Sequence, residues 1–337
     1  MSMNIYFGNL MLLIYLHVAA FYTLFIQISL NSLIFYGSLL IMGQLGTTIA
    51  AHRYFAHRSF ECIKFFRYFL VMLQSFSPFG SILHYVRYHR LHHNFIGTNA
   101  DPFNLNRGFF FSYIGWLFTE AHHDVYVERK NVKMDDLNQD SMLQYQKSNY
   151  VLLTTIINFI FPTFVCVFFF NDSIISAWHM NMMRILILLH WSLMINSFGN
   201  FIGKKPYNKD ITPKSSDILS LLGLGEGFNN YHYVYPWDYK ASEKISTTFN
   251  ISATLIDFVW MFGIVTKRYT TFIEMVERDA ISNGDGSHLY AQRMAKVWAD
   301  KSYIKTGDSK RDNINIWGFG DNKMSDEDKK QVKVLNY

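Results

Sequence analysis

Charged side chains are missing from the beginning of this chain, since no Asp, Glu, Lys or Arg occurs between Met1 and His52. That stretch is long enough for two crossings of a hydrocarbon core about 30 Å thick, each of which needs about 20 residues. Two further apolar segments follow, separated by a short segment that contains Asp172 and Arg184. We therefore expect four membrane-spanning helices, near residues 8–27, 32–50, 150–171 and 185–203.

Cysteine is scarce as well: the chain has 2, Cys62 and Cys166, and the second lies within an expected span. A disulfide framework is therefore not expected. The first apolar segment lacks a basic region before it and is followed at once by a second one, so we interpret it as a retained span rather than a cleaved signal peptide. No internal repeat is evident. The net charge of +5 suits an anionic membrane surface or ligand and not nucleic acid.

Lysine and arginine follow the second and fourth expected spans, whereas the other two links carry little charge. Because basic residues near spans favour the cytosolic side, both termini are expected in the cytosol. The N-glycosylation sequon at Asn171 falls on the opposite, luminal link, where its closeness to the membrane disfavours glycosylation. The basic residues concerned are Arg53, Arg58, Lys64, Arg67, Arg87, Arg90, Lys204 and Lys205.

Shorter apolar segments indicate helices that lie on the membrane surface. Residues 65–86 and 108–118 are expected to be such helices, and residues 251–265, interrupted by Asp257, are expected to pack on the membrane face instead of forming a fifth crossing. Residues 124–147 are polar and form a cytosolic excursion. We divide the chain into a membrane domain, residues 1–280, and a polar cytosolic tail, residues 281–337, parts of which we expect to be poorly ordered.

Histidine is concentrated where the expected spans meet the cytosol. Two clusters, H-R-Y-F-A-H and H-R-L-H-H, supply His52, His57, His89, His92 and His93. The spacing of the last three places their rings on one face of a helix, and imidazole is a ligand that suits iron. A third segment, N-N-Y-H-Y at residues 229–233, repeats this spacing but has only His232. The pattern predicts a metal site beside the bilayer; the alternative is a set of ordinary polar histidines.

The ordered histidine motifs, together with A-D-P-F-N at residues 100–104, N-S-F-G-N at 196–200 and G-E-G-F-N-N-Y-H-Y at 225–233, resemble the membrane acyl-CoA desaturases of the stearoyl-CoA Δ9 type. The resemblance covers about residues 8–280. It implies an all-α integral membrane fold, with four transmembrane helices beneath a helical cytosolic cap. It also implies an endoplasmic reticulum enzyme with two iron ions. Such an enzyme uses O2 and electrons from cytochrome b5 and its reductase to place a double bond in a long-chain fatty acyl-CoA.

The resemblance also implies roles for individual residues. The metal ligands would be His52, His57, His89, His92, His93 and His232, with Asn196 at a position that reaches the metal. Asn200, Asn229 and Tyr233 stand where the family has ligand histidines. Asp101 and Glu226 match positions that orient ligand histidines, although turn or helix-end carboxylates are equally compatible. Arg87, Arg90, Lys204 and Lys205 are weaker candidates for the phosphates of CoA.

The three replaced histidines leave the activity open. An altered site would hold two iron ions if intact and fewer if impaired, and the alternative to a desaturase is an impaired relative that binds lipid or accompanies an active desaturase. Hydroxylation of an alkane or sterol on the same scaffold is a third hypothesis. No H-P-G-G-like haem segment occurs, so electrons are expected from a partner. His84, His122 and His123 match no ligand position, while His17 and His190 are expected to hydrogen-bond neighbouring helices inside the membrane.

Overall fold

The structure is a computed structural model that describes residues 4–243, 250–299 and 315–337. It is mostly helical, at 64%. By its internal contacts it divides into two compact units, the first made of Met1–Ala56, Lys64–His92 and Thr98–Met194, and the second of His57–Ile63, His93–Gly97 and Ile195–Tyr337.

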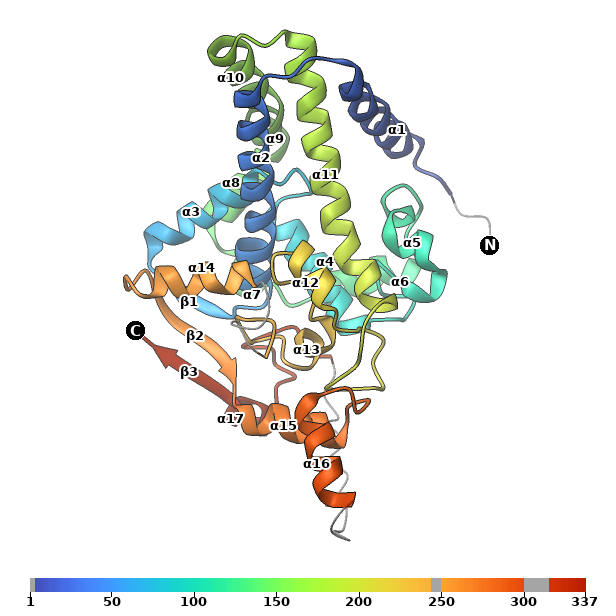
Figure 1. The fold of residues 1–337 in the computed structure, drawn as a ribbon, viewed down its shortest axis with the longest axis vertical. Coiled ribbons are helices and arrows are strands. Elements are labelled where there is room, and N and C mark those ends of the chain that lie inside the picture. Colours follow the sequence, from blue (N-terminus) through green and yellow to red (C-terminus); the bar gives the residue numbers. More distant parts are fainter. Residues whose placement is uncertain (1–3, 244–249, 300–314) are drawn as a thin grey trace. The chain divides into compact units, whose positions relative to one another are not determined.

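The elements are labelled in Figure 1 where there is room. In chain order they are α1 (Phe7–Tyr22), η1 (Thr23–Phe25), α2 (Leu30–Leu45), η2 (Gly46–Ala56), β1 (Phe60–Cys62), α3 (Lys64–Ser75), α4 (Ile82–Phe95), η3 (Leu105–Arg107), α5 (Phe109–Tyr113), η4 (Gly115–Leu117), α6 (His123–Asn131), α7 (Asp135–Asn138), α8 (Ser141–Ser148), α9 (Tyr150–Thr154), η5 (Thr155–Ile160), α10 (Phe161–Phe170), α11 (Ile174–Phe201), α12 (Asp217–Leu222), α13 (Asn229–Val234), α14 (Ile251–Trp260), β2 (Val265–Thr271), α15 (Ile273–Ser282), α16 (Leu289–Ala299), α17 (Asp326–Lys330) and β3 (Val332–Asn336).

Four helical segments are long and apolar enough to cross a membrane, which confirms the predicted number and fold class. They are Phe7–Phe25, Leu30–Ala56, Tyr150–Phe170 and Ile174–Phe201. Large apolar side chains such as Phe21, Leu24 and Phe169 are 61%, 69% and 70% exposed on them. A helix satisfies its own backbone hydrogen bonds, so such a segment can present apolar side chains to lipid at no polar cost.

The fourth span differs from its prediction, because α11 begins at Ile174 and contains Arg184 instead of following it. Arg184 is only 2% exposed. Its Nε donates to the side-chain oxygen of Asn181 at 2.9 Å, and its Nη2 donates to the carbonyl oxygen of Asn158 at 3.1 Å. Asn158 lies in η5, a π-helical segment, and in such segments the usual backbone hydrogen bonding is disrupted. The placement of Arg184 in a link between spans was therefore wrong: hydrogen bonds inside the bundle accommodate the charge.

Side chains from α1, α2, α10 and α11 contribute two clusters to the packed interior of the first unit. Leu16 and Ala19 of α1 pack with Met182 and Ile185 of α11. Tyr36 and Leu39 of α2 form a second cluster with Cys166 of α10 and Ala177 of α11. At Gly46 an added Cβ would lie 2.3 Å from the carbonyl oxygen of Leu73, so this close approach to α3 requires glycine.

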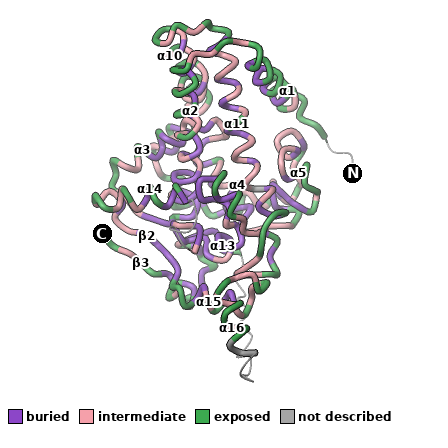
Figure 2. The backbone as a smooth tube through the Cα atoms, in the orientation of Figure 1, coloured by how far each residue is buried: buried purple, intermediate pink, exposed green. Residues whose placement is uncertain are grey.

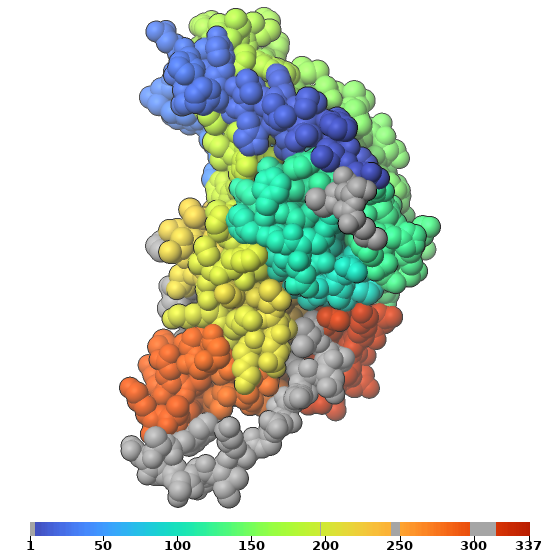
Figure 3. Space-filling view, turned by 90° about the vertical axis from the view of Figure 1, so that its right-hand side faces the viewer, coloured from blue at the N-terminus to red at the C-terminus, as the bar shows by residue number. Residues whose placement is uncertain are grey.

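The second unit contains a small antiparallel sheet with strand order β1-β2-β3, which the sequence analysis did not anticipate. Beside it, aromatic side chains of residues 207–269 and the apolar side chains of α15 and the C-terminal segment form a buried core. Residues 265–299 (orange) and 315–337 (red) also provide part of the molecular surface in Figure 3. The core members are Tyr207, Tyr231, Tyr235, Trp237, Tyr269, Met275, Val276, Ala280, Ile316, Met324 and Val332.

The described part of the expected tail is thus partly buried. Ile316 and Met324 are 3% and 4% exposed, and β3 extends the sheet by pairing with β2. The proposed division of the chain at residue 280 stays a prediction. Cys62 and Cys166 form no disulfide bond within the described part of the chain.

Candidate metal centre

In the first unit, the end of the second span and helix α4 bring predicted ligands together. His52 lies in η2, the π-helical continuation of α2, and its ring lies 4.7 Å from that of His89, centroid to centroid, at a right angle. His89, His92 and His93 all belong to α4, as their spacing predicted. His52 and His92 are 6% and 2% exposed, so their imidazoles are withdrawn from water.

Asp101 lies beside one of these histidines. Its Oδ1 is 2.7 Å from His92 Nδ1, and Asp101 is 2% exposed. A carboxylate accepts, so Nδ1 carries the proton and Nε2 is the basic nitrogen of His92. The same Oδ1 accepts from the backbone N–H of Phe103 at 2.9 Å, which holds the carboxylate in place. The role of Asp101 in orienting a ligand histidine stays a prediction, for which this hydrogen bond supplies the geometry.

Arg90, the neighbour of His89, was predicted as a weaker candidate for the phosphates of CoA, but its side chain is buried and held by protein groups. It is 0% exposed, and its Nη1 and Nη2 form a bidentate ion pair with the carboxylate of Asp136, both at 2.8 Å. Further hydrogen bonds go to the carbonyl oxygens of Phe55, Ala56 and Lys133. Every nitrogen of the guanidinium is engaged, which disfavours contact of Arg90 with the phosphates of CoA.

In the second unit, three further histidines gather around α13. The ring of His57 lies 4.7 Å from that of His93 and 4.5 Å from that of His232, centroid to centroid. The Nε2 atoms of His93 and His232 are 3.2 Å apart and share a hydrogen bond. Helix α13 is buried over Asn229–Tyr233, as Figure 2 shows in purple. Beside His232, burial and the adjacent Asp238 raise the pKa of Tyr231 well above its ordinary value, so its hydroxyl stays a donor.

The substituted positions are occupied by side chains with structural contacts. Asn229 Nδ2 donates to the carbonyl oxygen of Ile195 at 3.2 Å, and the ring of Tyr233 stacks on that of His93 at 4.5 Å. An added Cβ at Gly199 would lie 2.0 Å from Asn229 Nδ2, so this glycine makes room for the amide. Asn200 is 5% exposed. The side chain of Asn196 lies outside the described residues.

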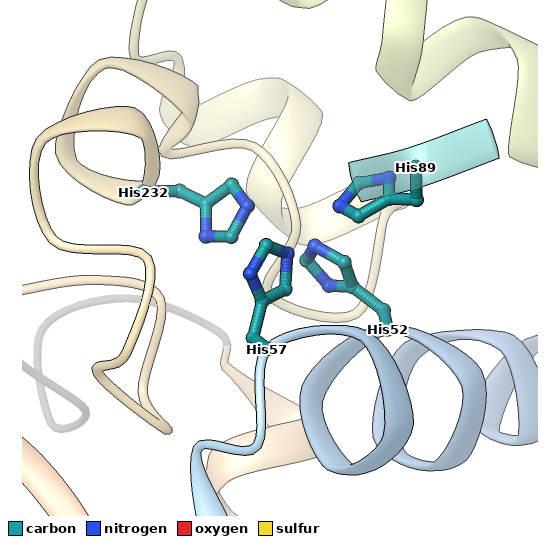
Figure 4. Close-up of side chains that lie close together, drawn as sticks. All are labelled: His52, His57, His89 and His232. Carbon is teal, nitrogen blue, oxygen red and sulfur yellow. The ribbon is translucent and has the colours of Figure 1, made fainter. Parts of the chain in front are cut away.

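One group among the described residues has the donors and spacing of a metal site. His52, His57, His89 and His232 each offer one ring nitrogen, and these atoms all lie within 4.8 Å of one another. Figure 4 shows the four rings turned toward one another. Clustered neutral imidazoles suit transition metals such as iron, so the residues present fit a metal centre.

The other predicted residues differ in exposure. Glu226 is 8% exposed. Arg87 donates to the carbonyl oxygen of Arg129, and Lys205 Nζ donates to that of Lys209, at 3.3 and 3.1 Å. Lys204 is exposed. These contacts leave the proposed substrate role of Arg87, Lys204 and Lys205 a prediction.

Three histidines outside the ligand set, His17, His190 and His122, have hydrogen-bond partners. His17 Nε2 and His190 Nε2 are 3.0 Å apart, and the hydroxyl of Tyr113 is 2.7 Å from His190 Nδ1. The expectation of hydrogen bonding between helices is confirmed for this pair. His122 caps α6 by accepting from the N–H of Asp124.

Two partners of the site escaped the sequence analysis. The Asp136 carboxylate that neutralises Arg90 lies 46 residues away along the chain. The backbone carbonyl of Trp317, which accepts from His57 Nδ1, lies 260 residues away. Backbone carbonyls leave no trace in a sequence pattern. The only available signal was the pair of glycines in W-G-F-G-D, residues 317–321.

The spans and the clustered imidazoles define a membrane protein with a histidine-rich candidate metal centre. No family model matches the chain. It is 34% identical to an acyl-CoA Delta-9 desaturase of Acheta domesticus over 329 residues, 96% of this chain and 84% of the relative. It is 32% identical to an acyl-CoA Delta-12 desaturase of Tribolium castaneum, over 97% and 91% of the two chains. Stearoyl-CoA desaturase 5 of Bos taurus is 34% identical, over 84% and 85%. The chain belongs to the acyl-CoA desaturase family.

Proposed function

We propose that this protein is an acyl-CoA desaturase that introduces a double bond into a long-chain fatty acyl-CoA. The observation that carries the proposal is the four-histidine group, His52, His57, His89 and His232, in a member of this family. Relatives with 32–34% identity are named for double bonds at Delta-9 and Delta-12. The position of the bond therefore does not follow from family membership.

Iron is the proposed cofactor. The residues that would hold it are His52, His57, His89, His92, His93 and His232, together with Asn196. Bound iron would supply the oxidising power, drawn from O2, that removal of hydrogen from an unactivated methylene requires. Each ligand imidazole must present a lone pair, and buried acceptors such as Asp101 hold the proton on the opposite ring nitrogen.

The chain itself contributes binding, orientation and exclusion of water. The low exposure of His52, His57 and His232, at 6%, 1% and 6%, keeps bulk water from the centre. A dry, preorganised site strengthens electrostatic interactions and limits side reactions. Arg87, Lys204 and Lys205 remain candidates for contact with the phosphates of CoA, whereas Arg90 holds the scaffold through Asp136.

The proposed setting is the endoplasmic reticulum membrane, with both termini and the histidines on the cytosolic side. Cytochrome b5 and its reductase are the proposed electron donors, and O2 is the proposed co-substrate. Basic residues such as Arg58, Lys64 and Arg67 follow the second span and support this orientation.

An impaired relative that binds lipid or accompanies an active desaturase is the second candidate. The contacts of two substituted residues favour it: the Asn229 amide is committed to the Ile195 carbonyl, and the Tyr233 ring stacks on His93. Loss of a single ligand or of its orienting partner typically lowers metal affinity or activity by about 10- to 100-fold. Changes at Asn200, Asn229 and Tyr233 together could therefore abolish turnover.

The test is the fatty-acid profile of a desaturase-deficient yeast strain that expresses the chain, beside a variant with Asn200→His, Asn229→His and Tyr233→His. Gas chromatography with mass spectrometry detects new unsaturated acids, and iron per purified chain is measured in parallel. His52→Ala is the inactive control, and expression and membrane insertion are checked for each variant.

New unsaturated acids from the unmodified chain support the desaturase. Products from the triple variant alone would mean that the scaffold accepts acyl-CoA but that the natural chain has lost its chemistry. If neither the unmodified chain nor the triple variant makes such products, and the purified protein holds fewer than two irons per chain, the desaturase proposal is contradicted and the lipid-binding candidate is favoured.

A further inference from the structure

A segment near the C-terminus, residues 316–321, contacts His57 at two points; we name it the C-terminal clasp. The ring Nδ1 of His57 hydrogen-bonds to the backbone carbonyl of Trp317. The backbone N–H of Phe319 donates to the carbonyl oxygen of His57 at 3.0 Å. The clasp therefore hydrogen-bonds to both the ring and the backbone of one predicted ligand.

The carbonyl contact determines the tautomer of His57. A carbonyl oxygen has no proton to give, so the shared proton belongs to Nδ1. Nε2 is then the basic nitrogen, which is the form that a metal ligand needs. Metal-ligating histidines generally donate their other ring N–H to an oxygen acceptor, which fixes ring orientation and raises ligand basicity. His57 is 1% exposed, so water does not compete for this contact.

The clasp is itself held in one conformation. Asp321 is 3% exposed; its Oδ2 accepts from the N–H of Trp317 at 2.9 Å and its Oδ1 from the N–H of Lys323 at 3.0 Å. Trp317 is 2% exposed. The ring of Phe319 stacks on that of Tyr269 at 4.0 Å, which attaches the clasp to β2. The orientation of the Trp317 carbonyl is thus fixed by the buried carboxylate of Asp321, by the burial of Trp317 and by the stacking of Phe319.

Close packing at Gly318 adds an independent constraint. Its φ of +154° is unusual for other residues, and an added Cβ would lie 2.3 Å from the carbonyl oxygen of His57 and 2.7 Å from its Cα. Only glycine allows the clasp to lie this near the ligand's backbone.

We propose that the C-terminal clasp is a positioning element of the metal centre: the Trp317 carbonyl holds His57 in the metal-binding tautomer, and Asp321 holds that carbonyl in place. This inference rests on the metal-binding part of the proposed function. It assigns a task to a segment that the sequence pattern assigned to a polar tail.

The test uses the full chain, purified in detergent and stripped of metal, and titrates it with Co(II) as the probe. Cobalt absorption reports affinity and ligand environment, and thermal unfolding of the metal-free protein reports the fold separately. Asp321→Asn removes the charged acceptor, and Gly318→Ala forces the clasp away from His57. Asp326→Asn is the control for the first, because Asp326 is 92% exposed. Gly286→Ala controls for strain, because Gly286 also has positive φ but an added Cβ meets nothing within 4 Å.

Asp321→Asn and Gly318→Ala are expected to weaken Co(II) binding on the order of 10-fold and to alter the cobalt spectrum. The two controls are expected to bind as the unmodified chain does. Trp317→Phe keeps the carbonyl and is expected to retain most of the affinity. This variant separates the carbonyl contact from general packing.

Three outcomes would contradict the proposal that the clasp positions His57 for metal binding. If Asp321→Asn and Gly318→Ala bind Co(II) with unchanged affinity and spectrum, the metal centre stands and the clasp has no role in it. If the weakened binding merely follows a matching loss of metal-free stability, or if Trp317→Phe reproduces it, the segment is structural only. If the unmodified chain binds no Co(II), the metal proposal itself fails and the clasp fails with it.

Discussion

Oxygen acceptors set the protonation of individual histidines in this protein. His92 faces the carboxylate of Asp101 and His57 faces the carbonyl of Trp317, each through Nδ1. In both cases Nε2 becomes the basic nitrogen, but the carboxylate also stabilises positive charge that a bound metal would place on the ring. The carboxylate partner should therefore matter more for metal affinity than a neutral acceptor of similar shape.

Replacement of Asp101 by asparagine tests that difference in charge. The amide keeps an oxygen acceptor but loses the negative charge, so Asp101→Asn is expected to lower metal affinity about 10-fold. Co(II) titration of the metal-stripped chain measures the effect. Asp124→Asn is the matched control, because Asp124 also approaches a histidine Nδ1, that of His122 at 3.3 Å, but is 49% exposed. Equal affinities of Asp101→Asn and the unmodified chain would remove Asp101 from the site.

Helix α11 is the element in which the sequence-based prediction and the structure differ most. The prediction began this span at residue 185 because it required a segment without charge, whereas the helix runs from Ile174 through Arg184. Hydropathy cannot identify the acceptors at Asn158 and Asn181, which come from a π-helical segment and from the same helix. A buried charge in a span is tolerated only with such partners, and removal of one partner leaves a costly uncompensated group.

The Arg184 hydrogen bonds can be measured by a double-mutant cycle. Asn181→Ala is expected to lower the free energy of unfolding by about 1–3 kcal/mol, because the Nε of Arg184 loses its acceptor. The double variant with Asn181→Ala and Arg184→Leu should lose less free energy of unfolding than the sum of the losses in the two single variants. The difference, the coupling free energy, is expected to be about 0.5–3 kcal/mol. Thermal and denaturant unfolding in detergent micelles measure all four proteins. Strict additivity would mean that the contact between these two side chains contributes nothing to stability.

At the scale of the whole molecule, local patterns identified the spans and the histidines, while contacts distant in sequence did not appear in any pattern. The i, i+3, i+4 spacing placed His89, His92 and His93 on one helix, as α4 confirms. The sheet was missed because β1 has 3 residues, too few for an alternating pattern, and pairs with β2 some 200 positions later. Residues 315–337 looked like tail because their burial depends on side chains contributed by other segments.

Sidedness is the remaining property of the whole molecule that the sequence predicts and that an experiment can decide. The basic residues that follow the second and fourth spans should hold those ends in the cytosol, so an acceptor tag for N-glycosylation fused after Tyr337 should stay unmodified in microsomes. The same tag, placed on a flexible spacer between α10 and α11 near Asn171, should be glycosylated and should shift on a gel until endoglycosidase removes the sugar. This insertion is the matched control for tag recognition. Glycosylation of the C-terminal tag together with an unmodified loop tag would invert the topology. It would also place the histidines in the lumen, away from a cytosolic source of electrons, and so contradict both the orientation and the proposed electron donors.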